Sequence, residues 1–197
     1  MKKFLFLFLS LFYFLTCLNA KDNEMILKSA NAFATVMRGN PDTAGLVANS
    51  KAILIFPSVK KVGLVIGGMY GDGVAIYKNG NNFTVSSAEI TNASLGLQIG
   101  YEDNYLVVFI MSDQIVNDMR KAEIKLGGDV TALAGNASAN IGTLNAFTQD
   151  MYVYTDKTGV FIGASLGGVV LSSNNSVVYD LNSYGVKNLI STITGQQ

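Results

Sequence analysis

One pattern of five residues occurs three times in the chain, as Gly63-Leu64-Val65-Ile66-Gly67, as Gly96-Leu97-Gln98-Ile99-Gly100 and as Gly159-Val160-Phe161-Ile162-Gly163. Each copy lies in a longer run in which apolar residues alternate with small or polar ones. Alternation with a period of two is typical of a β-strand that buries one face. Glycine inside a strand marks a bend, a bulge or the close approach of another backbone. The sequence therefore predicts three equivalent strands of a tightly curved antiparallel sheet.

Glycines are also dense between Gly63 and Gly73, which superficially suggests a nucleotide-binding loop. Such a loop needs a strand, then the glycines, then the N-terminus of a helix. A further strand pattern follows the glycines here, so we assign them to the bending of the sheet. The glycines with this predicted structural role are Gly63, Gly67, Gly68, Gly71, Gly73, Gly96, Gly100, Gly159 and Gly163.

Strand and helix patterns fill the rest of the chain. The run Ala52-Ile53-Leu54-Ile55-Phe56 is continuously apolar and is followed by Pro57, which is expected of a fully buried strand with proline at its end. Turns are predicted at Gly71-Asp72-Gly73, Asn79-Gly80, Glu102-Asp103 and Asn174-Asn175. Helices are predicted at residues 24–38 and 43–49, after Ser112, and between Ser183 and Gly195. The predicted fold class is α+β: a strongly curved, glycine-rich antiparallel β-sheet or barrel-like β-core covered by about three to four helices.

The first twenty residues have the composition of a secretory signal peptide. Lys2 and Lys3 precede a Phe/Leu-rich run that ends at Leu18, and Ala20 is a small residue at the expected cleavage point. Residues 1–20 are therefore predicted to be a signal peptide, and residues 21–197 a single domain that is periplasmic or secreted after cleavage near Ala20. Cys17 leaves a second reading open, in which it is the lipidated residue of a lipoprotein, although the residues before it fit that signal poorly.

The composition excludes several kinds of chemistry. The chain has no His, and its one Cys lies in the predicted signal peptide, so the commonest general base and the thiolate nucleophile are both missing. Ser58 near Lys60 and Lys61 is the only local candidate for a Ser–Lys arrangement, and no stretch has the spacing of a calcium loop. The formal net charge is zero, which does not favour a nucleic-acid partner. We predict a protein that is not an enzyme, with no cofactor, no metal and no nucleic-acid partner.

The predicted first helix is amphipathic and has two interpretations. Ile26, Ala30, Phe33, Ala34 and Met37 form one apolar stripe at helical spacing. The stripe either packs on the sheet or docks on a lipid surface.

Basic residues near turns and helix ends also have two interpretations: an ordinary solvated surface, or a patch for anionic headgroups. The residues predicted to bind lipid are Ile26, Lys28, Phe33, Met37, Arg38, Lys51, Lys60 and Lys61.

Several ordered motifs resemble the SYLF domain family. The opening motif of that family is similar to residues 52–63, which end in the basic pair Lys60-Lys61, followed by Gly67-Gly68-Met69-Tyr70-Gly71-Asp72-Gly73. Residues 94–100, 126–130 and 154–166 also resemble the family in the expected order. The similarity extends over residues 24–184.

The resemblance implies lipid binding. Members of the family are expected to recognise acidic phospholipids with the help of an N-terminal amphipathic helix, and some bind actin. With its predicted signal peptide, this chain is similar to a bacterial secreted member, so phospholipid or a membrane surface is the expected partner and no actin is expected. The competing interpretation is a structural or envelope-associated protein that binds a protein partner, such as another envelope protein, through the surface of its sheet.

Overall fold

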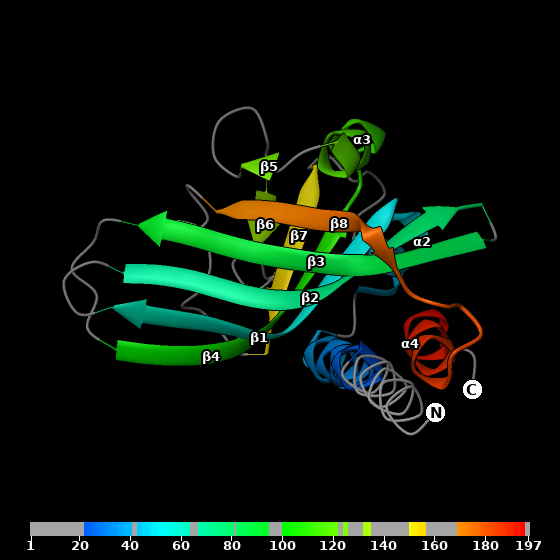
Figure 1. Ribbon diagram of the computed structural model, residues 1–197, viewed down its shortest axis with the longest axis horizontal. Coiled ribbons are helices and arrows are strands. Elements are labelled where there is room, and N and C mark those ends of the chain that lie inside the picture. Colours follow the sequence, from blue (N-terminus) through cyan, green and yellow to red (C-terminus); the bar gives the residue numbers. More distant parts are fainter. Residues whose placement is uncertain are drawn as a thin grey trace, which may run out of the picture.

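The computed structural model describes residues 22–40, 43–63, 67–80, 82–94, 100–121, 124–125, 132–134, 150–156 and 169–195. Within this part of the chain one sheet has the strand order β5-β8-β3-β2-β1-β4-β7-β6, and every neighbouring pair is antiparallel except β6 and β7 (Figure 1). The strands are β1 Ala52–Gly63, β2 Gly67–Asn79, β3 Asn82–Ser94, β4 Gly100–Ile110, β5 Ile124–Lys125, β6 Ala132–Ala134, β7 Met151–Thr155 and β8 Val170–Val178. The helices are residues 22–38, α2 Ala44–Asn49, α3 Asp113–Lys121 and α4 Tyr184–Thr194. The predicted α+β class is confirmed, and the curved sheet is open, with β5 and β6 at the edges of the described part.

Each face of the sheet carries its own hydrophobic core. Side chains alternate along a strand, so Ile53 and Ile55 of β1 face one side, where the N-terminal helix (residues 22–38) and α4 pack. Leu54 and Phe56 face the other side, where α3 packs. Both faces of this segment are fully buried, which confirms the interpretation of its continuous apolar run.

Strand β1 continues through Pro57 instead of ending there. The register of β1 against β4 shifts between Phe56 and Val59, so Pro57 lies in a bulge, where a missing backbone N–H is tolerated. Beyond the bulge β1 runs on to Gly63, which pairs with Gly67 on one side and Gly100 on the other. Because Gly63 ends β1 and Gly67 begins β2, the prediction that the first glycine pattern is itself a strand is wrong.

Two predicted turns are wrong because β2 and β4 run straight through them. Asp72 and its flanking glycines lie inside β2, and an added Cβ at Gly71 would be 2.6 Å from the carbonyl oxygen of Ser58 in the β1 bulge. The glycines therefore make room for β1 and do not form a turn. Glu102 and Asp103 lie in β4, opposite Lys61 and Lys60.

Of the other two turn predictions, one is wrong and one is confirmed. Asn174-Asn175 lies inside β8, where the register against β3 shifts between Ser86 and Ser87. The hairpin predicted at Asn79-Gly80 is confirmed, but Asn79 is the last paired residue of β2, opposite Asn82, and Gly80 follows it with φ of +62°. Gly96, Gly159 and Gly163, with the centre of the first glycine pattern, lie outside the described residues.

None of the helices in the described ranges is long and apolar enough to cross a membrane.

Candidate interaction surfaces

The apolar stripe of the N-terminal helix packs on the sheet. Ile26 and Phe33 are only 2% and 3% exposed, and the Phe33 ring meets the edge of Phe109 of β4 at a centroid distance of 6.5 Å. Met37 is partly buried, and its sulfur accepts a hydrogen bond from Thr43 at 3.1 Å. The side chains predicted to enter lipid are thus part of the core in this structure.

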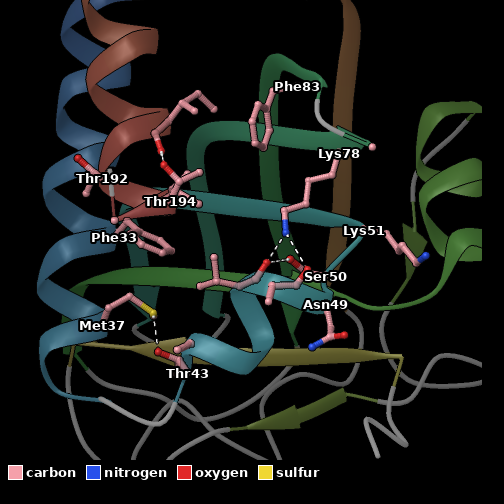
Figure 2. Close-up of a pocket in the computed structure, with 17 residues that line it drawn as sticks. Phe33, Met37, Thr43, Asn49, Ser50, Lys51, Lys78, Phe83, Thr192 and Thr194 are labelled. Atoms are coloured by element: carbon pink, nitrogen blue, oxygen red, sulfur yellow. Dashed lines mark hydrogen bonds between the residues drawn. The ribbon is translucent and has the colours of Figure 1, made fainter. Parts of the chain in front are cut away.

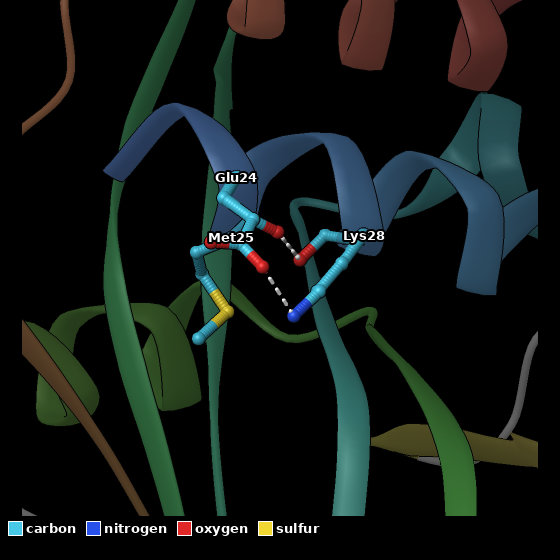
Figure 3. Close-up of polar contacts among 4 residues, drawn as sticks. Glu24, Met25 and Lys28 are labelled. Carbon is cyan, nitrogen blue, oxygen red and sulfur yellow. Dashed lines mark hydrogen bonds and ion pairs between the residues drawn. The ribbon is translucent and has the colours of Figure 1, made fainter. Parts of the chain in front are cut away.

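The basic residues predicted to bind lipid do not gather into one patch. Figure 3 shows Lys28 paired with Glu24 one turn earlier, at 2.7 Å, and this contact lowers the pKa of the Glu24 carboxyl. Lys51 pairs with Asp113 at 3.4 Å. Arg38 is exposed at the end of its helix.

Lys60 and Lys61 point to opposite faces of the sheet because they are consecutive residues of β1. The Lys60 ammonium lies 5.9 Å from the centroid of the Tyr70 ring, whereas Lys61 is opposite Met69 and Glu102 on the other face. The two lysines therefore do not lie side by side on one face of the sheet.

Within the described residues, one part of the sheet has no helix over it. The N-terminal helix and α4 cover the segments around Ile53, Val74 and Phe109, while β1 to β4 extend well beyond them (Figure 1). Beyond the helices, the strand positions that continue the same face carry polar and aromatic residues. We call this surface the uncovered face: Ser58, Lys60, Tyr70, Asp72, Glu89, Thr91, Tyr101 and Asp103.

Two tyrosines dominate the uncovered face. Tyr70 is 52% exposed and Tyr101 is 63% exposed, on the strands that flank β1. Ser58 donates a hydrogen bond of 2.7 Å to Asp103, so it is not arranged as a nucleophile beside a lysine. No sequence pattern indicates this surface, because its exposure depends on where the covering helices end.

Like charges meet within the uncovered face. Asp72 of β2 lies directly opposite Glu89 of β3, and both are exposed. Like charges at directly opposite positions of antiparallel strands destabilise the pair. The uncovered face is therefore acidic around Asp72, and the basic residue among those that define it is Lys60.

A groove of about 1060 Å³ lies between the N-terminal helix, α2, α4 and the β2–β3 hairpin (Figure 2). Phe33, Met37 and Phe83 contribute apolar lining. The Lys78 ammonium reaches across it and donates to the carbonyl oxygens of Val47 and, at 3.4 Å, Ala48 near the end of α2. Burial lowers the pKa of the Lys78 ammonium.

An adjoining pocket of about 310 Å³ shares Phe83 and Ile190 with the groove and adds Leu181 and Lys187. In the part of the chain that the structure describes, no three His, Cys, Asp or Glu side chains are grouped to hold a metal ion.

Comparison with known proteins shows the family to which the chain belongs. A family model for Ysc84, described as "Las17-binding protein actin regulator", matches residues 91–193. The SH3 domain-containing protein PJ696.02 of Schizosaccharomyces pombe is 31% identical over 133 residues, which are 64% of this chain and 31% of that protein. The chain thus matches less than a third of its relative's length. No solved structure matches significantly.

The matched description corrects the expectation about partners. The resemblance to a secreted bacterial member led to the prediction that no actin is involved, and that prediction is wrong, because the matching family is described as an actin regulator. The family description points to protein or actin-related partners instead.

Proposed function

Because this chain belongs to the Ysc84 family, the SYLF family that its motifs resemble, we propose that it is a binding protein without enzymatic activity whose partner is another protein. The surface we assign to that partner is the uncovered face. The observation that carries the assignment is the pair of exposed tyrosines, Tyr70 and Tyr101, on the two strands that pair with β1.

The physical properties of the uncovered face suit a protein interface. Tyrosine is enriched at the centres of protein interfaces, because it buries a large ring and keeps a polar group that can hydrogen-bond. Around the tyrosines β2 is paired with both β1 and β3, and β4 is paired with β1, so binding there orders little new backbone and costs little entropy. Lys60, Asp72 and Asp103 add charges around the rings, which provide specificity in orientation.

The family description directs the first test to actin. We expect the protein without residues 1–20 to co-sediment with actin filaments. Tyr70→Ala combined with Tyr101→Ala should weaken this binding at least about tenfold, which corresponds to the loss of roughly 1.4 kcal/mol at an interface centre. The matched control is Tyr184→Ala, which removes a tyrosine that is 71% exposed at the start of α4, outside the uncovered face.

The outcomes separate the competing functions. Equal loss of binding in Tyr184→Ala and in the double variant would remove the uncovered face from the proposal. Absence of the protein from the filament pellet, together with pelleting by vesicles of acidic phospholipid, would favour the lipid-binding function predicted from the sequence. Lipid contact through Ile26 and Phe33 would then require the N-terminal helix to leave the sheet, since both side chains are in the core.

A further inference from the structure

A second surface has the properties of a recognition site, on the side of the molecule where α2 and α4 lie. The groove beside α2 and the pocket beside α4 are contiguous, because both are lined by Phe83 and Ile190. We call them together the α2–α4 groove. At the pocket end Leu181 is 44% exposed, so the apolar lining continues onto the surface.

The charges that line the α2–α4 groove all have one sign. Lys51 and Lys78 line the larger part and Lys187 lines the smaller part. None of the described residues lining either part is an aspartate or a glutamate. Lys51 and Lys78 each have a contact within the protein, with Asp113 and with the α2 carbonyls, while Lys187 is exposed on α4. An occupant with an apolar side and carboxylates at its edges complements this lining in both respects.

The shape of the groove favours a folded peptide over a single acyl chain. Small-molecule sites typically bury about 70–90% of their ligand, and an acyl chain in this groove would stay wetted along the side that is open to solvent. The groove is flanked by α2 and α4, whose backbones are hydrogen-bonded within their helices. An extended peptide could pair only with the short stretch of β3 before Ser86, so most of its backbone groups would have to be satisfied within the occupant itself. A helix meets this requirement and presents an apolar stripe at its i, i+3, i+4 and i+7 positions.

We infer that the α2–α4 groove binds an acidic amphipathic helix of a partner protein. The apolar stripe of that helix packs on Phe83, Ile190 and Leu181, and its flanking carboxylates lie near Lys51, Lys78 and Lys187. This site is independent of the uncovered face, so either can fail without the other.

A displayed library of helical peptides tests the inference. The peptides have about 16 residues, or four to five helical turns, with Leu at the stripe positions and Glu, Lys, Gln or Ser elsewhere. Selected against the purified protein without residues 1–20, the pool should be enriched at least about threefold in Glu over Lys. Lys187→Glu should weaken the best selected peptide about fivefold at low salt, and this difference should shrink at high salt because the charges are near the surface.

Matched variants locate the site. Lys121→Glu reverses an exposed charge at the end of α3 and should leave peptide binding unchanged. Leu181→Ser removes an exposed apolar contact and should weaken binding, while the double tyrosine variant of the uncovered face should bind normally. A pool without excess Glu overturns the inference, as does equal weakening by Lys121→Glu and Lys187→Glu. Failure to select any peptide, with submicellar oleate occupying the groove instead, also overturns it and makes the occupant an anionic amphiphile.

Discussion

Gly73 of β2 lies so close to the neighbouring strand β1 that only glycine fits there. A Cβ at this position would collide with the carbonyl oxygen of Ile55 and lie 2.7 Å from the Phe56 ring. Backbone cannot move aside as a flexible side chain can, so we expect Gly73→Ala to lower the free energy of unfolding by about 1–3 kcal/mol. Gly68→Ala is the matched control in the same strand, because its Cβ would meet only the Asn92 carbonyl at 3.6 Å. Urea denaturation of both variants measures the difference, and equal stability would contradict this account of Gly73.

Tyr77 should make the stability of the protein depend on pH in the alkaline range. Burial raises the pKa of its phenol above the usual 10.0, and its oxygen is 2.5 Å from the Ser173 hydroxyl. In the unfolded chain the phenol loses its proton near pH 10.0, whereas in the folded chain it keeps the proton to higher pH. The protonated phenol therefore contributes fully to the free energy of unfolding below pH 10.0, and this contribution is lost as the pH rises through the folded-state pKa. At pH 7 we expect Tyr77→Phe to cost about 1 kcal/mol through the lost hydrogen bond. The difference in free energy of unfolding between wild type and variant should become smaller above pH 10.0. If denaturation experiments at high pH give the same difference as at pH 7, Tyr77 does not have this role.

At the scale of elements, local signals were sufficient for the last helix. Ser183 accepts a hydrogen bond from the Val186 N–H at 3.3 Å, and Gly195 ends α4 with φ of +67°. Caps of this kind involve residues a few positions apart, so the sequence predicts them well. The buried segment at the start of β1 was equally predictable, because an apolar run on both faces needs no partner to be recognised.

Elements shaped by distant neighbours were not predictable in the same way. The glycines around Asp72 have the composition of a turn, but their cause is the bulge in β1, which only the pairing of the two strands shows. Glu102 and Asp103 read as a polar turn because the lysines opposite them are some forty positions earlier in the chain.

The candidate sites depended even more on tertiary structure. The amphipathic stripe with Ile26 and Phe33 has the same pattern whether it faces a core or a membrane, and the structure places it in the core. Tyr70 and Tyr101 form a surface only because none of the helices that the structure describes extends over their part of the sheet. Lys51 and Lys187 line one groove although they are far apart in the sequence.

At the scale of the whole molecule, the predicted signal peptide decides which partners are accessible. We propose that residues 1–20 direct export and are removed near Ala20. Mass spectrometry of the protein recovered from its native host should then give a chain that begins at Lys21. A chain cut just before Cys17 and carrying lipid would support the lipoprotein reading. Recovery of the intact chain from the cytosol would contradict export and would leave cytosolic actin within reach.

The two ends of the described chain are joined by a contact between helices. The Gly185 N–H at the start of α4 donates to the Asn23 side chain at 3.1 Å, and the Gly185 position has no room for a Cβ beside Asn23. A stretching force applied at the termini would therefore act first on these two helices. The two helices would detach from the sheet before its strand pairs separated, and the apolar face beneath them around Ile53 and Val74 would be exposed first.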